Sequence, residues 1–306
     1  MGEKKGTIYT KLDSIAFEEK TKVLLVGNGL NLSFDKSRSI DSIMIDEWNK
    51  YHDGKIQSRE EDSEHPIWKL PFPLQVVAAT KDNVQSCMKN LANEFRSINI
   101  SEEQKDLINT ILKVGFDSIL TTNYSLEFEK STIKDCNKGR IYKKYRKTQK
   151  QNKQQKDLGI FQCVELPDEN NTLLWHIHGT SLRVNSMVMG ELYYGNLLRE
   201  VSNRALKINF NKSSKKKKRF TPKSWIDYFL FCDVHILGFG LDFSEIDIWW
   251  LLSYKKIKYP NSKVYFYAPK ISKDKKMLLS CYNVEIPQIN FDGDYIKYYN
   301  DVCKQI

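Results

Sequence analysis

Residues 171 to 180 read Asn-Thr-Leu-Leu-Trp-His-Ile-His-Gly-Thr, and this stretch decides the fold that the sequence predicts. Its apolar run Leu173 to Trp175 predicts a buried strand that delivers His176, His178 and Gly179 at its end. Side chains on a strand alternate between its two faces. We expect only one of the two histidines to face a given pocket. By this argument alone, either histidine is eligible.

Three further segments share this form, an apolar strand that ends in small or polar residues. They are residues 23–31, 118–124 and 234–242. Strands that alternate with helical stretches predict an α/β fold, Rossmann-like, with a mostly parallel sheet and helices on both faces. In such a sheet, ligands bind beyond the carboxyl ends of the strands, where we expect these four segments to meet.

The chain of 306 residues is long enough for one α/β domain with insertions, and we expect a single domain over residues 1–306. A helical insertion is predicted at about 40–114, with helical periodicity in 75–97 and 101–114 and a cap at Ser101. A basic, glutamine-rich insertion is predicted at about 130–158. The other expected elements are helices at 11–20, from about 126, and at 191–206, 225–231 and 243–252, with last strands at 263–268 and 285–291.

Composition excludes several classes of protein. No apolar run approaches the roughly 20 residues that span a bilayer, and no apolar segment follows the charged N-terminus as in a secretory signal. The six cysteines include no Cys-x-x-Cys pair, which argues against a structural zinc site. We therefore expect a cytoplasmic protein with reduced thiols, no membrane contact and no metal.

The formal net charge is +10, and two basic segments carry much of it. One runs from Lys143 to Lys156 and the other from Lys215 to Arg219. They suit a nucleic-acid or acidic-partner surface, or else simply solvated loops. Aromatic residues are not interleaved with them at a spacing suited to base stacking, so nucleic acid is not excluded but is not favoured.

The first predicted strand leads directly into Gly27-Asn28-Gly29-Leu30-Asn31. A strand that closes on Gly-x-Gly suits a turn that a phosphate can approach closely. The third glycine of the dinucleotide-binding fingerprint is missing, because Leu32 stands in its place. The segment is therefore not an ordinary dehydrogenase fingerprint.

Four signatures taken together resemble the sirtuin-like family. They are Gly27-Asn-Gly-Leu-Asn, Thr121-Thr-Asn-Tyr, His178-Gly179 and Gly238-Phe-Gly-Leu-Asp, in the family's order and over most of the chain. The variants look more like the bacterial antiphage-defence branch, in which the domain destroys NAD, than like the protein deacylases. Ser125 departs from the family, since an aspartate closes that motif in sirtuins, and the paired-cysteine zinc module is absent.

The resemblance implies two catalytic residues. Asn123 would hold the nicotinamide ribose or position the attacking water, and His178 would take a proton from water or from a ribose hydroxyl. This assigns the chemistry to His178 and a structural role to His176. Contacts with NAD are implied for the residues of the glycine turns and those beside Asn123, namely Gly27, Asn28, Gly29, Asn31, Thr122, Tyr124, Gly238, Gly240 and Asp242.

The chemistry is compatible with these side chains. When the bond between ribose and nicotinamide breaks, the leaving group departs neutral, so a base of near-neutral pKa and a polar orienting group suffice. Glu245 and Asp247 are expected on the solvent edge of a helix or paired with lysines. Trp249 and Trp250 are expected in the core or at an interface.

The sequence thus predicts an NAD glycohydrolase, the toxic effector of an antiphage system. Such an enzyme must be restrained by self-assembly or by a separately encoded partner protein. Two alternatives stay open, a non-catalytic subunit that binds NAD or ADP-ribose and an NAD-dependent protein deacylase. A weaker resemblance is to the abortive-infection family H, whose members also open with a Gly-Asn-Gly turn.

Overall fold

The computed structural model describes residues 21–35, 40–133, 145–147, 159–208 and 222–306. The predicted helix at 11–20 and the lysine run at 215–218 lie outside these ranges. So does the basic insertion, apart from residues 130–133 and the strand at 145–147.

A single eight-stranded sheet forms the centre of the molecule, in the order β3-β4-β5-β2-β1-β6-β7-β8. The six neighbouring strands β5, β2, β1, β6, β7 and β8 pair in parallel. At one edge of the sheet, β4 pairs antiparallel with both β3 and β5. This confirms the predicted Rossmann-like α/β fold with a mostly parallel sheet. The strands are β1 (Lys22–Val26), β2 (Ser118–Thr121), β3 (Tyr145–Lys147), β4 (Gln162–Glu165), β5 (Leu173–His176), β6 (Asp233–Leu237), β7 (Val264–Tyr267) and β8 (Val284–Glu285).

The four predicted strand ends meet at one edge of the sheet. Val26, the last residue of β1, is level with Thr121 on β2 and with Leu237 on β6. Thr121 is in turn level with His176 on β5. The residues that follow these strands therefore emerge side by side at the carboxyl edge, where ligands bind in sheets of this type.

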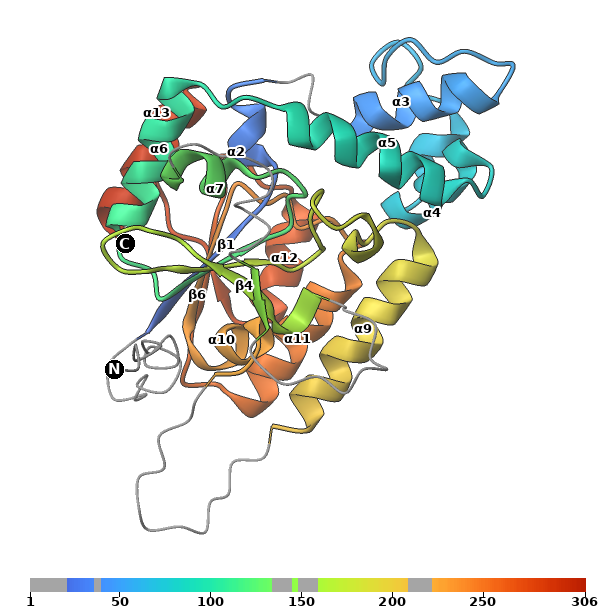
Figure 1. The fold of residues 1–306 in the computed structure, drawn as a ribbon. Coiled ribbons are helices and arrows are strands. Elements are labelled where there is room, and N and C mark those ends of the chain that lie inside the picture. Colours follow the sequence, from blue (N-terminus) through green and yellow to red (C-terminus); the bar gives the residue numbers. More distant parts are fainter. Residues whose placement is uncertain (1–20, 36–39, 134–144, 148–158, 209–221) are drawn as a thin grey trace, which may run out of the picture.

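Helices cover both faces, and the side chains of β1 show how. Val23 and Leu25 enter one hydrophobic core, which also includes residues of α9 (Glu191–Leu206), α10 (Trp225–Phe231) and α11 (Ile246–Lys258). Leu24 and Val26 enter the other core, with residues of α6 (Glu102–Lys113) and α13 (Tyr295–Gln305). This alternation is the period of a strand that is buried on both faces. Figure 1 shows the two helical layers on either side of the sheet.

The helix bounds agree closely with the predicted ones at 191–206 and 225–231. The α-helices are α2 (Gly29–Leu32), α3 (Ile40–Tyr51), α4 (Phe72–Thr80), α5 (Val84–Ser97), α6 (Glu102–Lys113), α7 (Glu127–Thr132), α9 (Glu191–Leu206), α10 (Trp225–Phe231), α11 (Ile246–Lys258), α12 (Lys273–Cys281) and α13 (Tyr295–Gln305). Short 3-10 helices span Pro66–Lys69, Gly159–Phe161 and Val184–Ser186. No helix among the described residues is long and apolar enough to cross a membrane.

Helices α3, α4 and α5 form a lobe beside the carboxyl edge of the sheet (Figure 1), with a hydrophobic cluster of its own. Lys81 and Asp82 have positive φ angles and break the predicted 75–97 segment into α4 and α5. Helix α6, capped by Ser101 as predicted, packs instead against α13 on the sheet. The region from 40 to 114 therefore divides between the lobe and the sheet layer.

Two predicted elements need correction. Strand β8 ends at Glu285 and does not continue to 291, because Pro287 has no N–H to donate to a neighbouring strand. Helix α11 begins at Ile246, three residues later than the predicted 243. Helices α12 and α13 were not predicted.

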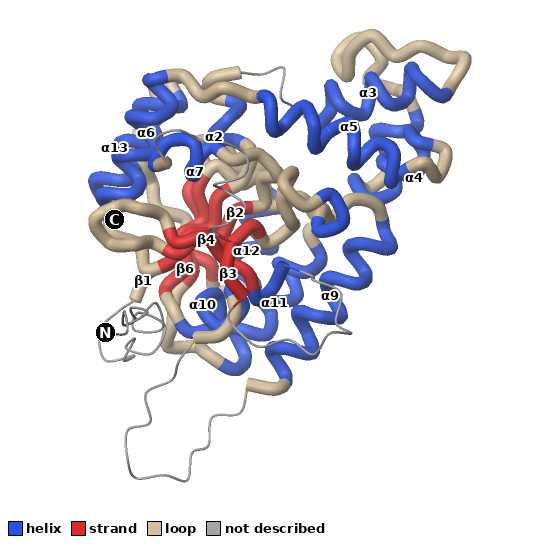
Figure 2. The backbone as a smooth tube through the Cα atoms, in the orientation of Figure 1, coloured by secondary structure: helices blue, strands red, loops and turns tan. Residues whose placement is uncertain are grey.

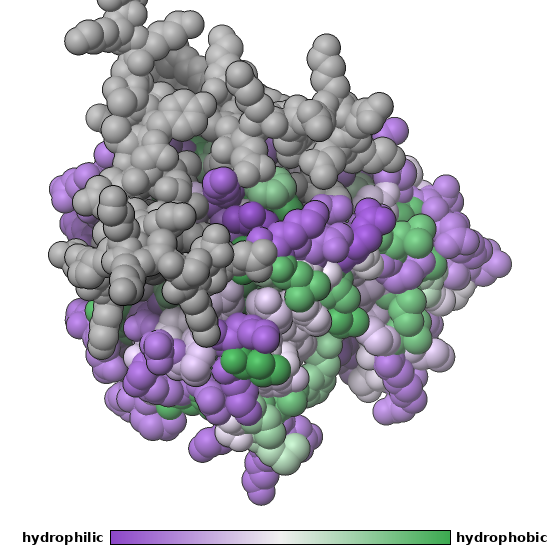
Figure 3. Space-filling view, turned by 90° about the horizontal axis from the view of Figure 1, so that it is seen from below, coloured by the Kyte–Doolittle hydropathy of each residue, from purple (hydrophilic) through white to green (hydrophobic). Residues whose placement is uncertain are grey.

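Viewed from below, the described part of the surface is mainly hydrophilic, with smaller hydrophobic groups between (Figure 3).

Candidate active site

A cavity of about 400 Å³ lies at the carboxyl edge of the sheet, between the strand ends and the helical lobe. Its size is typical of a small-molecule site. The lobe contributes apolar residues, and the strand ends contribute polar ones. The lining residues are Asn28, Gly29, Leu32, Asp41, Ile43, Met44, Phe72, Phe95, Thr122, Asn123, Tyr124, Ser125, His178, Met189, Tyr194, Phe239, Gly240, Leu241, Asp242 and Glu245.

The cavity brings together most of the residues that the sequence singles out. Asn123 and His178 both line it, whereas His176 does not. The predicted contact residues on its wall are Asn28, Gly29, Thr122, Tyr124, Gly240 and Asp242. Gly27, Asn31 and Gly238 do not line the cavity.

The two glycine turns pack against each other. The Gly29 N–H donates to the Gly238 carbonyl at 2.7 Å, and the Gly27 N–H donates to Leu237 at 3.4 Å. A Cβ atom at Gly29 would lie only 2.6 Å from the Gly238 oxygen. These glycines are therefore required for the close approach of two strand ends, and both amide hydrogens are used within the protein. A phosphate that approached Gly27 and Gly29, as the sequence predicts, would therefore find no free N–H on either residue.

The two histidines of the opening segment have separate places. His176 is buried, with Nδ1 2.7 Å from the Asn123 carbonyl oxygen and Nε2 3.1 Å from Glu129 Oε1. After His178 the chain turns sharply at Gly179, with φ +87, where a Cβ would lie 1.9 Å from the Ser186 oxygen. The glycine that follows His178 is therefore a steric requirement, since only glycine fits this turn.

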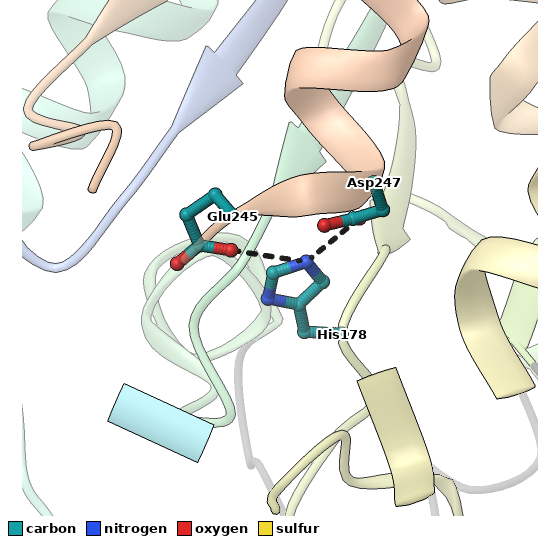
Figure 4. A group of neighbouring side chains, drawn as sticks. All are labelled: His178, Glu245 and Asp247. Carbon is teal, nitrogen blue, oxygen red and sulfur yellow. Dashed lines mark hydrogen bonds and ion pairs between the residues drawn. The ribbon is translucent and has the colours of Figure 1, made fainter. Parts of the chain in front are cut away.

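His178 contacts two carboxylates that come from the start of α11 (Figure 4). Its Nε2 lies 3.1 Å from Asp247 Oδ2 and 3.7 Å from Glu245 Oε2. The neutral imidazole that suits this contact carries its hydrogen on Nε2 and donates to Asp247, which leaves the Nδ1 lone pair available. In Figure 4, Nδ1 carries no dashed line and points away from Asp247.

The expectation for Glu245 and Asp247 is wrong. Their side chains are 13% and 0% exposed, and both contact His178 and not a lysine. Because α11 begins later than predicted, Glu245 occupies the N-cap position and Asp247 the first turn, beside the strand ends. The sequence signal was present as two acids, spaced by one residue, directly after a strand that ends in Gly-x-Gly.

These contacts set the protonation of the site. Burial alone would lower the pKa of His178, but the charges of Asp247 and Glu245 raise it above the ordinary histidine value. Burial, together with the charges of Asp247 and Asp242, raises the pKa of Glu245 to about 7. A histidine made more basic by a buried carboxylate is the arrangement that general bases use.

Asn123 is held in one orientation by Glu127, a residue that the sequence analysis missed. Its Nδ2 donates to Glu127 Oε1 at 2.5 Å and to the Gly27 carbonyl at 3.4 Å. A carboxylate only accepts hydrogen bonds, so the amide nitrogen must face it. The Asn123 Oδ1 is buried and has no hydrogen-bond partner within the described protein.

A buried polar network supports this arrangement from behind. Asn31 donates to Glu127 Oε1 at 3.3 Å and to Ser125 Oγ at 3.4 Å, and it accepts from Gln104 Nε2 at 2.9 Å. Asn31 thus holds the carboxylate that holds Asn123. Glu127, two residues after Ser125, supplies the carboxylate at the centre of this network.

Aromatic side chains close the cavity around His178. The Tyr194 ring lies 5.5 Å from the His178 ring, edge to face, and its hydroxyl is 3.5 Å from Glu245 Oε2. The Tyr124 hydroxyl donates to the Val188 carbonyl at 2.6 Å, which fixes that ring. Trp249 is buried, as expected, and Trp250 is partly buried against the same core.

The same cluster has the spacing of a cation site. One ligand atom each from His178, Glu245 and Asp247 lies within 4.8 Å of the others. One nitrogen and two oxygens suit a divalent transition metal, which would occupy Nε2 of His178. The prediction that the protein uses no metal stays a prediction.

Comparisons with known proteins do not identify a family for this chain. No protein-family model matches the chain, and no curated protein matches it either.

Proposed function

We propose that the chain is an NAD glycohydrolase, which converts NAD and water to nicotinamide, ADP-ribose and a proton. The observation that carries the proposal is the meeting of His178, backed by Asp247, and Asn123, backed by Glu127, on the wall of one cavity. A base and an orienting amide are what this cleavage requires. The motifs that resemble the sirtuin-like family supply two of these residues, His178 and Asn123.

His178 acts as the general base. Asp247 accepts the Nε2 hydrogen and orients the ring, so that Nδ1 removes a proton from water as its oxygen attacks C1′ of the ribose. The bond from C1′ to the pyridine nitrogen breaks, and its electron pair stays with nicotinamide. Nicotinamide therefore departs uncharged without the help of an acid.

Asn123 acts as a hydrogen-bond acceptor. Because Glu127 takes the amide nitrogen, Oδ1 is the atom that remains for a ligand, and it accepts from a ribose hydroxyl or from the attacking water. Positioning of this kind supplies much of the rate in hydrolysis.

The resemblance also supports a biological role, that of the toxic effector in a bacterial antiphage system. An unrestrained enzyme of this kind would deplete the NAD of its own cell. Self-assembly or a separately encoded partner protein therefore holds the site inactive until infection.

Purified protein incubated with NAD tests the proposal through nicotinamide release, measured alone and with candidate partner proteins. We expect release that falls at least about 100-fold in His178→Ala and in Asn123→Ala. Asp301→Asn, at an exposed pair with Lys304, is the matched control and should keep full activity.

Other outcomes have distinct meanings. Tight binding of NAD without release under any condition would overturn the hydrolase and favour a non-catalytic NAD-binding subunit. Release that depends on an acyl-lysine peptide would identify a deacylase. Release that survives both substitutions would show that the site lies elsewhere.

A further inference from the structure

One carboxylate oxygen beside His178 has no partner. Asp247 Oδ2 lies 3.1 Å from His178 Nε2, but Asp247 Oδ1 is buried and has no hydrogen-bond partner within the described protein. The Asp247 side chain is completely buried, so water does not solvate this oxygen freely. An unpaired buried acceptor is costly, and a ligand that brings a positive charge to it removes that cost.

The protein itself supplies little positive charge at this place. Glu245 and Asp242 line the cavity beside His178, whereas no lysine or arginine among the described residues lines it. Lys275, on α12, donates to the Gly240 carbonyl at 2.6 Å and is not part of the cavity wall. The neutral ring of His178 offers a single hydrogen on Nε2 to the carboxylates of both Asp247 and Glu245. The cluster therefore holds more acceptors than donors.

The spacing of the three side chains is that of ligands to one metal ion. One ligand atom each from His178, Glu245 and Asp247 lies within 4.8 Å of the others, and both carboxylates point toward Nε2 (Figure 4). The oxygens lie 3.1 and 3.7 Å from that nitrogen. Bonds of about 2.0 to 2.2 Å to a tetrahedral Zn²⁺ place ligand atoms roughly 3.3 to 3.6 Å apart. Small movements of the side chains are therefore enough to bind an ion.

An ion at this place would remove the base of the proposed reaction. A metal binds the lone pair of a neutral ring nitrogen, so an ion on Nε2 of His178 requires the ring hydrogen on Nδ1. Nδ1 is the atom that takes the proton from water in the proposed mechanism. With a hydrogen bound there it has no free lone pair, and the imidazole is no longer a base.

We propose that His178, Glu245 and Asp247 bind a divalent transition-metal ion, with Zn²⁺ as the best match, and that the bound ion inhibits the enzyme. The metal site stands on the geometry of the cluster, whereas the inhibition rests on the proposed function. The ion is an inhibitor and not a cofactor, so the proposed hydrolysis itself runs without a metal. Such an ion provides one means of the restraint that an NAD-depleting enzyme requires.

Metal binding is measured first, without any need for hydrolysis. The full chain is dialysed against a chelator, and Zn²⁺ is then titrated into it by calorimetry. We expect an ion to bind at the cluster with an affinity that falls at least about tenfold in Glu245→Gln. The control Glu285→Gln, whose side chain is 50% exposed and lies outside the cavity, should keep the affinity of the wild type.

Inhibition is measured next, through nicotinamide release from NAD at increasing Zn²⁺. We expect release to fall over the concentration range in which the ion binds, and Glu285→Gln to respond as the wild type does. Addition of a chelator in excess of the ion should restore release. Binding of Zn²⁺ to an active enzyme without loss of activity would keep the metal site and reject its inhibitory role.

The inference and the proposed function fail separately. Absence of Zn²⁺ binding, or an affinity unchanged in both Glu245→Gln and Asp247→Asn, would overturn the metal site even if the protein releases nicotinamide. Asp247→Asn serves as the second variant if Glu245→Gln does not fold. Binding that depends on these side chains, in a protein that never releases nicotinamide, would reject the hydrolase and its inhibition but keep the metal site.

Discussion

Asp247 Oδ2 lies 3.1 Å from His178 Nε2, although His178 follows β5 and Asp247 lies in the first turn of α11. The Asp247 side chain is completely buried, and its Oδ2 accepts a hydrogen bond from His178 Nε2. The contact fixes the orientation of the imidazole and raises its basicity. It makes Asp247 a positioning residue for the reaction that we propose.

Asp247→Asn should lower nicotinamide release about 100-fold or more, with little change in the binding of NAD. Asparagine can still touch Nε2, but it removes the charge and can favour the wrong tautomer of His178. Steady-state kinetics check this, with Asp301→Asn as the exposed control. A variant that loses only binding would point to a structural role for Asp247.

The pH profile should report on the same contact. Only neutral His178 is a base, and its pKa is raised, so activity should increase as pH rises through a value above 6.5. Removal of either charge, in Asp247→Asn or Glu245→Gln, lowers that pKa and should move the acid limb to lower pH. A limb that stays in place in both variants would mean that another group titrates.

Glu127→Gln should allow the Asn123 side-chain amide to take either of its two orientations. Glutamine offers the Asn123 amide both a donor and an acceptor, so Oδ1 is no longer the only atom left for a ligand. Partners of this kind typically change activity by about 10- to 100-fold. The loss should appear in kcat/KM with the fold retained, as judged by thermal unfolding, and Glu285→Gln should match the wild type.

Metal tests separate two uses of the His178 cluster. If His178 is the base, EDTA should leave nicotinamide release unchanged, and added Zn²⁺ should inhibit by taking Nε2. Loss of activity in EDTA, restored by a divalent cation, would instead make the cluster a metal centre. Elemental analysis of the purified protein provides the independent readout.

Lys255 should matter for stability and not for the site. Its ammonium group is buried and donates to the carbonyls of Phe229, Leu230 and Cys232 at 2.7 to 3.1 Å. Lys255→Met keeps the volume but removes the ammonium donor from these carbonyls, of which, among the described residues, only that of Leu230 keeps a side-chain donor, Ser262 Oγ at 3.1 Å. Denaturant unfolding should show a loss of about 2 to 5 kcal/mol, whereas the exposed Lys256→Met should cost far less.

Local patterns in the sequence were sufficient to predict the parallel strands β5, β2, β1, β6 and β7, but not β3 and β4 at the edge of the sheet. Buried apolar runs that end in glycine, asparagine or histidine indicate parallel strands whose ends carry function, and register places these ends level. His176 and His178 are two residues apart, so alternation along a strand would place them on the same face. They separate because β5 ends at His176 and the chain turns at Gly179, so that only His178 reaches the cavity. The strands thus depend on residues that are neighbours in the chain, whereas the separation of the histidines does not.

The tertiary structure decided which groups support the two proposed catalytic residues. Glu245, Asp247 and Glu127 carry ordinary sequence signals, because an acid at the start of a helix is as common on a surface as in a site. Whether such an acid faces water or a histidine depends on where the helix begins and on how it docks against the sheet. The strand-end segment beginning at residue 171 therefore supplied the histidine, but only the packing of α11 beside it turned that histidine into a candidate base.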